Sequence, residues 1–244
     1  MNRGGTLRGL GVGPGDPELV TLKALRHLEA AEVVAYFAKR GRPGHAWTVV
    51  ASYLRGDQVE VRLEYPFTTE VPVSDARYPL AMGRFYDEAA ERLAAHLEAG
   101  RDVAVLCEGD PFFYGSFMYL HDRLADRFPT DVVPGVTGMS GCWARAQTPI
   151  THGDDVLTVL PGTLPEAELA RRLADTDAAV IMKVGRNLPA IRRALTQAGA
   201  LDRAILVERG TMPGEHISLL SDEELEHRVP YFSIVLIPGR KGAR

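Results

Sequence analysis

The sequence predicts an α/β protein built from two blocks of alternating strands and helices. Short runs rich in β-branched residues alternate with longer amphipathic stretches along the 244 residues, a pattern typical of βαβ units with much of the sheet parallel. Hydrophobic residues make up 45% and charged residues 25% of the chain, which is ordinary globular composition. A chain of this length is long enough for two domains that each bury a core.

The first block has the more regular pattern. Its leucines repeat every third residue from Leu19 to Leu28, which predicts a helix over 17–30 with one apolar face. We expect Asp16 to cap this helix and Pro17 to fill its first position, where a missing N–H costs nothing. The other expected elements, in order, are strand 7–12, strand 33–38, helix 47–54, helix 82–99, strand 103–106, helix 116–128 and strand 132–133.

A long connection separates two of these elements. The stretch from Gly56 to Pro79 contains three prolines and shows weak periodicity. A connection of this length inside a compact domain more often has a function or is mobile than serves only to join two elements.

The second block begins near Asp155. Strands are expected at 156–160, 179–182, 205–208 and 232–237, and helices at 165–174 and 188–198. The change of pattern between Pro149 and Asp154 predicts an N-terminal α/β domain of residues 1–150 and a C-terminal α/β domain of residues 151–244.

Composition argues against several classes of protein. The net charge is −4 and the basic residues are scattered, which disfavours a nucleic-acid surface. No apolar run approaches the ~20 residues of a membrane span, and the N-terminus lacks the apolar segment of a secretory signal. Cys107 and Cys142 support neither a disulfide framework nor a zinc site. We therefore expect a cytoplasmic protein without a bound metal.

Glycines fall at every second position from Gly9 to Gly15, just after a strand and before a helix. A dinucleotide or phosphate loop occupies this place in many folds. Here the third glycine of G-x-G-x-x-G would have to stand at Pro14 or Asp16, and no Gly-Lys-Ser/Thr follows. Asp16 would also repel a phosphate from the helix N-terminus. The loop is thus either a tight turn or part of a different binding site.

Two further glycine-rich loops follow strands. One spans residues 109–116 after Glu108, and the other spans 134–141. Ligands of open parallel sheets collect beyond the carboxyl ends of the strands, and glycine lets the backbone approach them closely. Three such loops, without a cluster of metal-ligating residues or a nucleophile-elbow motif, predict a cofactor held mainly by backbone groups.

These loops resemble the signatures of a known family. Gly11-Val12-Gly13-Pro14-Gly15-Asp16-Pro17, Glu108-Gly109-Asp110-Pro111 with Tyr114-Gly115-Ser116, and Val133-Pro134-Gly135-Val136-Thr137 are similar to the three signatures of the tetrapyrrole (corrin and porphyrin) methylases, in the family's order. The resemblance covers essentially the whole chain. It implies two α/β domains with a trough between them that holds S-adenosylmethionine, and S-adenosylhomocysteine as product.

The resemblance also implies an activity. Residues 109–124, 65–69 and 154–162 are most similar to family members that methylate carbon 20 of precorrin-2 or cobalt-precorrin-2 in cobalamin biosynthesis. Family members are typically homodimers, and the substrate is a small molecule. One alternative is a methylase that acts on another ring carbon or on a protein-bound histidine derivative. Another is a non-catalytic tetrapyrrole carrier. A third is a nucleotide-binding module, which is disfavoured because the first loop matches neither the dinucleotide nor the phosphate-loop motif.

Site residues are carried over from the signatures position by position. Pro14 is expected to border the cofactor, Met182 to lie near the adenine, and the backbone at Thr211 and Pro238 to close the site. The expected cofactor-binding residues are Pro14, Gly109, Asp110, Phe112, Thr137, Gly138, Met182, Thr211 and Pro238.

The substrate carries eight carboxylates, so a protein of net charge −4 needs local cations to bind it. The candidate substrate-binding residues are Arg77, Arg84, Tyr114, Arg145 and His152, together with Lys39 and Arg40. A solvated surface charge is the alternative for each cation. After the transfer, the methylated ring carbon must lose a proton. The candidate bases are Glu108, Asp154 and Asp155. Each has helix capping or a loop hydrogen bond as its alternative role.

Overall fold

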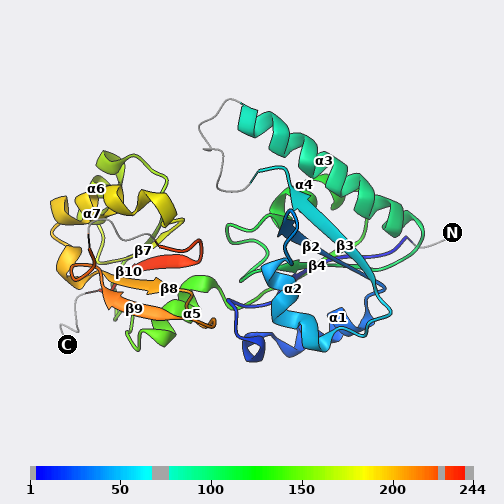
Figure 1. Cartoon of the computed structure of the whole chain (residues 1–244), viewed down its shortest axis with the longest axis horizontal. Coiled ribbons are helices and arrows are strands. Elements are labelled where there is room, and N and C mark those ends of the chain that lie inside the picture. The colour runs from blue at the N-terminus through cyan, green and yellow to red at the C-terminus, as the bar shows by residue number, and fades with distance from the viewer. Residues whose placement is uncertain (1–3, 68–76, 225–228, 240–244) are drawn as a thin grey trace. The chain divides into compact units, whose positions relative to one another are not determined.

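The computed structural model describes residues 4–67, 77–224 and 229–239, with only the backbone of Arg77. The chain divides into two compact units, residues 1–137 and residues 138–244 (Figure 1). Each unit contains one five-stranded sheet with helices packed against it. The α/β fold class expected from the sequence is therefore confirmed.

The sheet of the first unit is wholly parallel. Its strands lie in the order β3-β2-β4-β1-β5. Their bounds are β1 Leu7–Gly11, β2 Val33–Lys39, β3 Val59–Tyr65, β4 Val103–Cys107 and β5 Thr130–Val133. Because all the strands run the same way, their carboxyl ends meet at one edge of the sheet, where the loops that follow them gather.

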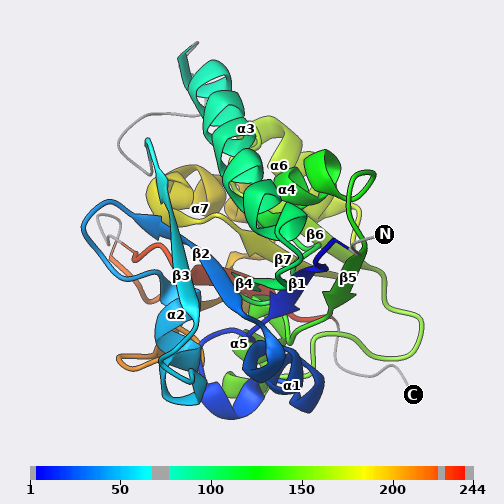
Figure 2. The same cartoon turned by 90° about the vertical axis from the view of Figure 1, so that its right-hand side faces the viewer.

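Helices cover both faces of this sheet. Figure 2 shows α3 (Arg77–Glu98) and α4 (Phe117–Leu124) on one side, and α1 (Leu22–Ala30) and α2 (His45–Val50) on the other. Successive strand residues point to opposite faces of the sheet and contribute to two hydrophobic cores. Val105 packs beneath α3 and α4, whereas its neighbour Leu106 packs towards α1 and α2. Burial on both faces explains why the central strands are continuously hydrophobic.

The first helix begins later than its leucine pattern predicts. Pro17–Leu19 forms a separate 3₁₀ turn, and Val20 is extended before α1 starts at Leu22. The hydroxyl of Thr21 caps α1 by accepting from the Ala24 amide at 3.1 Å, while Asp16 caps only the short turn. Two capping side chains in one stretch thus divide the predicted helix into two.

The expected long connection contains a strand that the sequence interpretation missed. In β3, Val61 and Leu63 are buried, whereas Glu60, Arg62 and Glu64 face outward. This alternation is typical of an edge strand with one solvated face. The remainder of the connection, residues 68–76, lies outside the described residues.

The sheet of the second unit is mixed, with strand order β6-β7-β10-β8-β9. Only β6 and β7 are parallel, and the other pairs are antiparallel. The strand bounds are β6 Leu157–Pro161, β7 Ala178–Met182, β8 Ile205–Glu208, β9 His216–Leu219 and β10 Ser233–Ile237. The prediction of mainly parallel pairing therefore holds for the first unit and not for the second, and β9 was not foreseen.

The second unit also has helices on both faces of its sheet. Helices α6 (Glu166–Ala174) and α7 (Leu188–Gln197) share a core with β7 and β10. On the other face, Cys142 of α5 (Gly138–Arg145) packs with Val207 and Leu236. This contact places α5 in the second unit, so that unit starts at Gly138 and not at the 150/151 boundary expected from the sequence.

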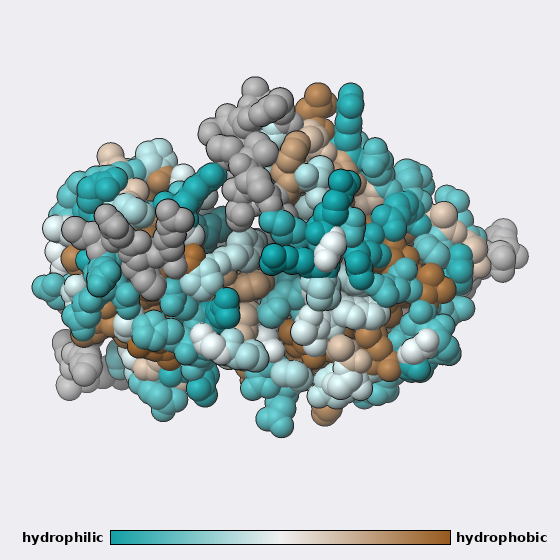
Figure 3. Space-filling view, viewed as in Figure 1, coloured by the Kyte–Doolittle hydropathy of each residue, from teal (hydrophilic) through white to brown (hydrophobic). Residues whose placement is uncertain are grey.

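Apolar residues concentrate in these cores. On the face drawn in Figure 3, hydrophilic residues cover most of the surface and hydrophobic residues appear in small scattered groups. None of the helices in the described ranges has the length and apolarity to cross a bilayer.

Candidate active site

Three glycine loops converge at the carboxyl edge of the first sheet. They follow β4, β1 and β5, which are neighbours in the sheet. The loop after β1 is joined to the loop after β4 by a bridge in which the Gly109 amide donates to the Gly13 carbonyl at 2.8 Å. The alternating glycines of the first loop thus serve to pair it with the second.

Glycine is required where these loops touch. A Cβ on Gly11 would lie 2.5 Å from the Gly135 nitrogen, and a Cβ on Gly135 would lie 2.1 Å from the Gly109 carbonyl oxygen. Both distances fall far inside van der Waals contact. The backbones of the three loops therefore pack directly against one another, which fixes their relative positions.

Asp110 fastens the second and third loops together. Its Oδ1 accepts from the Phe112 amide at 2.9 Å, and its Oδ2 accepts from the Gly135 amide at 3.1 Å. Gly109 has a φ of +66°, a conformation that favours glycine. The Gly109-Asp110-Pro111 signature thus builds a fixed turn whose carboxylate is already committed to backbone amides.

A cluster of aromatic rings lies beside this turn. The hydroxyl of Ser116 is 2.6 Å from the Tyr65 hydroxyl and accepts from the Tyr86 hydroxyl at 3.1 Å. The Tyr65 ring stacks on Phe37 with centroids 5.4 Å apart. Since Phe37 and Tyr65 stand near the carboxyl ends of β2 and β3, the cluster occupies the same edge of the sheet as the glycine loops.

Comparison with known proteins identifies the family. The model of the tetrapyrrole (corrin/porphyrin) methylases matches residues 6–225. The chain belongs to this family. It is 59% identical to a precorrin-2 C(20)-methyltransferase of Sinorhizobium sp, covering 97% of this chain and 96% of that protein. It is 33% identical to a cobalt-precorrin-2 C(20)-methyltransferase of Salmonella typhimurium, covering 96% of each.

A solved structure supports the same fold. The uroporphyrin-III C-methyltransferase of Thermus thermophilus, in complex with S-adenosylhomocysteine, superposes with a TM-score of 0.68. The two chains are 24% identical, and the match covers 95% of this chain and 96% of that one. The resemblance inferred from the three glycine signatures is thereby confirmed.

The cofactor-binding residues expected in the methylase's first unit come together. Pro14 is buried, whereas the Phe112 side chain is 48% exposed at the tip of the loop after β4. The Asp110 side chain links the loop after β4 to the loop after β5. Tyr114, expected to contact substrate, is 41% exposed and has a φ of +55°, a strained backbone of the kind found at functional sites. Thr137 lies in the stretch that follows β5 and is the last residue of the first unit.

Charge at this edge suits a cationic ligand. Asp16, Glu108 and Asp110 all belong to the first two loops. Desolvation by the surrounding protein raises the pKa of Glu108 to about 7, against the opposing effect of a hydrogen bond from the Ala46 backbone. Glu108 is nevertheless exposed to solvent, which screens part of this effect. Carboxylates and exposed aromatic rings favour a sulfonium or an ammonium group over a phosphate.

The residues expected from the second unit divide between the two ends of its sheet. Met182 ends β7, and the strand register places it near the start of β10, where a Cβ on Gly138 would lie 3.5 Å from Ile234 Cδ1. Thr211 follows β8 at this same end, because Glu208 pairs with Ser233. Its buried Oγ1 has no hydrogen-bond partner among the described residues. An unpaired buried hydroxyl costs free energy, so this atom suits a ligand.

Pro238 is a correction to the expected set. The antiparallel register pairs Ile237 with Ala179, so Pro238 lies at the opposite end of the sheet from Met182 and Thr211. Its carbonyl accepts a hydrogen bond from the guanidinium of Arg203. The direction of β10, which decides the position of Pro238, could not be inferred from the sequence.

Asp155 and His152 belong to the same far end as Pro238. The Asp155 carboxylate accepts from the His152 amide at 2.8 Å, and the Gly239 amide bonds the Ile150 carbonyl at 2.8 Å. Asp155 thus has the loop hydrogen bond that was its alternative role. Asp154 and the His152 ring are exposed.

The remaining substrate candidates differ in their surroundings. Arg145 is already engaged, because its Nε lies 2.8 Å and 2.9 Å from the two carboxylate oxygens of Glu215. The same carboxylate accepts from the Thr211 amide at 2.7 Å. Arg145 therefore supports the Thr211 turn, and its expected contact with the substrate stays a prediction. Arg84 is exposed, and the Arg77 side chain lies outside the described residues.

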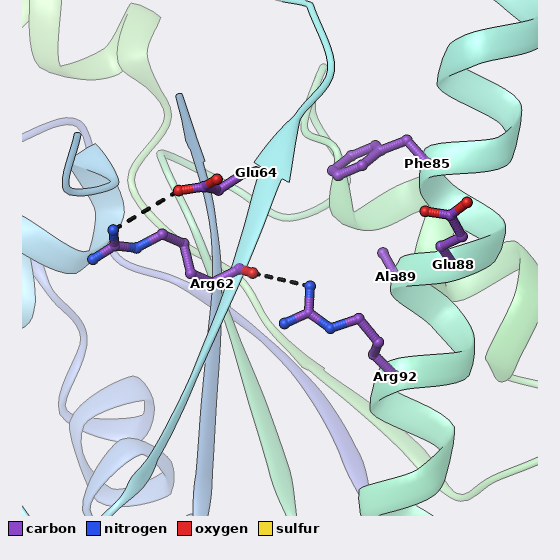
Figure 4. Close-up of a pocket in the computed structure, with 6 residues that line it drawn as sticks. All are labelled: Arg62, Glu64, Phe85, Glu88, Ala89 and Arg92. Atoms are coloured by element: carbon purple, nitrogen blue, oxygen red, sulfur yellow. Dashed lines mark hydrogen bonds and ion pairs between the residues drawn. The ribbon is translucent and has the colours of Figure 1, made fainter. Parts of the chain in front are cut away.

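The methylase also has a cavity that the sequence did not indicate. It has a volume of about 240 Å³ and lies between β3 and α3 (Figure 4). Arg92 donates to the Arg62 carbonyl at 3.1 Å, and Arg62 faces Glu64 at 3.9 Å. The cavity is separated from β4 by β2. Its lining residues are Arg62, Glu64, Phe85, Glu88, Ala89 and Arg92.

Proposed function

We propose that this methylase transfers the methyl group of S-adenosylmethionine to carbon 20 of precorrin-2, giving precorrin-3A and S-adenosylhomocysteine in cobalamin biosynthesis. The observation that carries this proposal is the 59% identity to a precorrin-2 C(20)-methyltransferase over 97% of the chain. The identity to the relative named for cobalt-precorrin-2 is 33%. The difference favours the metal-free substrate, with cobalt-precorrin-2 as the second candidate.

The proposed division of labour follows from the chemistry. The bound cofactor supplies an activated methyl group on a sulfonium, so the protein mainly has to align the reactants and exclude water. In the first unit we assign the cofactor to Pro14, Gly109, Asp110, Phe112 and Thr137. The direct packing of the glycine loops suits this task, because it leaves little freedom for the backbone that would contact the cofactor.

In the second unit, we assign Gly138, Met182 and Thr211 to the cofactor. The buried and unpartnered Oγ1 of Thr211 favours this assignment. The Thr211 backbone has a φ of +68°, and the Glu215 carboxylate holds its amide. A strained turn held by a half-buried carboxylate is a fixed element on which a polar contact can be built.

We assign the loss of the proton after methyl transfer to Glu108. It directly precedes Gly109, and the protein around it raises its pKa to about 7, which is the range in which a general base works well at neutral pH. Asp155 is committed to its turn, and Asp154 is an exposed residue at the far end of the second unit. Glu108 is therefore the strongest of the three candidates.

For the substrate, we assign Tyr114 and Arg84 to the exposed wall of the site. A homodimer in the cytoplasm is the assembly and location that we propose with this activity. Both cysteines are free thiols, as expected in a reducing compartment. Light scattering of the purified protein measures its oligomeric state, and a monomer at micromolar concentration would contradict the dimer.

Two alternatives are separated by one set of assays. Wild-type protein is incubated with S-adenosylmethionine and either precorrin-2 or cobalt-precorrin-2, and both products are followed by mass. The proposal predicts the gain of one methyl group, faster with precorrin-2. A protein that binds tetrapyrrole but neither binds nor consumes S-adenosylmethionine is a carrier. A product methylated at another carbon is the work of a different methylase of the family.

A further inference from the structure

The loop that follows β2 is basic and exposed. Lys39, Arg40 and Arg42 are all exposed, as are Gly41 and Pro43 between and after them. A turn in which the Arg42 amide donates to the Lys39 carbonyl at 3.0 Å, with Gly41 at a φ of +71°, holds them together. We call residues 39–43 the β2–α2 basic loop.

Acidic residues are sparse around this loop. The sequence contains no Asp or Glu between Glu32 and Asp57. Glu64 on β3 comes near, with its Oε1 3.5 Å from the Gly41 amide, but it also faces the Arg62 guanidinium at 3.9 Å. Positive charge therefore dominates the surroundings of the loop.

The two arginines of the loop differ from most of the arginines whose side chains the structure describes. In the part of the chain that the structure describes, neither the Arg40 nor the Arg42 side chain has an ion-pair or hydrogen-bond partner. By contrast, many other arginines are engaged by a carboxylate or a carbonyl: Arg8, Arg55, Arg62, Arg92, Arg123, Arg127, Arg145, Arg171, Arg172, Arg192, Arg193 and Arg203. Two guanidinium groups are thus available for an external anion.

The loop lies at the edge of the sheet that carries the candidate site. Strand β2 pairs with β3 on one side, where Lys39 is opposite Tyr65, and with β4 on the other, where Tyr36 is opposite Leu106. All three strands are parallel, so the basic loop, the aromatic cluster and the Glu108 loop emerge at the same edge. An anion on the loop would lie at the same edge of the sheet as Phe37 of β2 and Tyr65 of β3.

We infer that Arg40 and Arg42 bind peripheral carboxylates of the tetrapyrrole. The inference rests on the proposed function, which supplies a substrate with eight carboxylates. A protein of net charge −4 repels such a polyanion unless it offers a local cationic site. Guanidinium groups match carboxylates in geometry and can bond them through two parallel hydrogen bonds. The loop therefore contributes affinity and orientation for the substrate, while the glycine loops serve the cofactor.

The test uses full-length protein and uroporphyrin III, a stable tetrapyrrole with eight carboxylates. Binding is titrated by quenching of tryptophan fluorescence at low ionic strength. The double variant Arg40→Gln/Arg42→Gln should bind the probe about tenfold more weakly, since it loses two charge-assisted contacts. The matched control Lys23→Gln/Arg26→Gln removes the same charge from exposed positions of α1 and should stay within twofold of wild type.

Two further measurements separate this inference from the proposed function. Added salt should weaken probe binding less in the Arg40/Arg42 variant than in wild type, because fewer ionic contacts remain to be screened. Calorimetry should show unchanged affinity for S-adenosylmethionine in all variants. Equal probe affinity in the Arg40/Arg42 variant and wild type, or equal weakening in the control variant, would overturn the inference while leaving the methyl transfer intact. Failure of wild-type protein to methylate precorrin-2 would instead overturn the proposed function.

Discussion

The carboxylate of Asp110 accepts a hydrogen bond from the backbone amide of Gly135, at 3.1 Å, and so links the loop after β4 to the loop after β5. Its other oxygen holds the Phe112 amide at 2.9 Å. One side chain thus fixes both the internal shape of its own loop and the position of its neighbour. The acidic residue of the family signature is explained by this structural role, without a direct role in the reaction.

We expect Asp110→Ala to lower the free energy of unfolding by about 2 kcal/mol, because two backbone amides lose a charged acceptor. Affinity for S-adenosylmethionine should fall with it, since the loop loses its fixed position. Denaturant unfolding and calorimetry measure the two effects. Asp126→Ala removes an exposed carboxylate and serves as the control. Wild-type stability and affinity in the Asp110 variant would contradict this role.

Gly135→Ala should be far more disruptive than its size suggests. The added Cβ would lie 2.1 Å from the Gly109 carbonyl oxygen, so the packed loops would have to separate, at a cost of about 3 kcal/mol. Gly83→Ala is the matched control, because nothing lies within 4 Å of its Cβ and it stands inside α3. That change should stabilise the protein by about 0.5–1 kcal/mol. Thermal unfolding of both variants tests the contrast, and equal effects would refute it.

Ser116 should couple energetically to Tyr65. Their hydroxyls are 2.6 Å apart, and a hydrogen bond of this kind contributes about 1 kcal/mol. A double-mutant cycle with Ser116→Ala and Tyr65→Phe should therefore give a coupling energy of about 0.5–1.5 kcal/mol in denaturant unfolding. Strictly additive effects would show that the contact contributes nothing to stability.

Glu108 should make stability depend on pH. Its pKa is raised to about 7 in the folded protein from the ordinary value of 4.5 for a glutamate, so folding favours the protonated carboxyl. The stabilisation that accompanies proton uptake is complete below about pH 4.5, declines as pH rises through about 7, and is absent above that. Wild-type protein should thus lose stability relative to Glu108→Gln between these values. Parallel pH profiles for the two proteins would show that the carboxyl is not perturbed.

The same residue should shape the pH dependence of activity. If Glu108 accepts the proton, the rate of product formation should rise with pH around an apparent pKa near 7 in wild type, and this limb should be lost in Glu108→Gln. A variant that unfolds cooperatively and is at least as stable as wild type at pH 7 is the control. A Glu108→Gln enzyme with the wild-type rate and pH profile would exclude this residue as the base.

Local patterns in the sequence were sufficient for most elements of the first unit. Its strands are buried on both faces, so each forms a short apolar run between helices whose apolar residues recur with helical periodicity. The glycine loops were located correctly because strand-to-loop-to-helix transitions are local. The start of α1 was misplaced because Asp16 and Thr21 can each cap a helix, and a leucine repeat runs through both.

Features that depend on pairing direction were not accessible in this way. The mixed sheet of the second unit reverses β10 relative to β7, which separates Pro238 from Met182. The engagement of Arg145 by Glu215, seventy residues away, likewise depends on tertiary structure. The alternation of Val61 and Leu63 with charged residues in β3 was visible in the sequence. The three prolines that follow it led to the interpretation of the whole stretch as a connection.

The position of the transferred methyl group tests the central claim most directly. The protein is incubated with S-adenosylmethionine carrying a ¹³C-labelled methyl group and with precorrin-2, and the product is examined by ¹³C NMR and mass spectrometry. The account predicts one labelled methyl group per macrocycle, attached to carbon 20. A label on any other carbon, or no labelled product from either precorrin-2 or cobalt-precorrin-2, would contradict it.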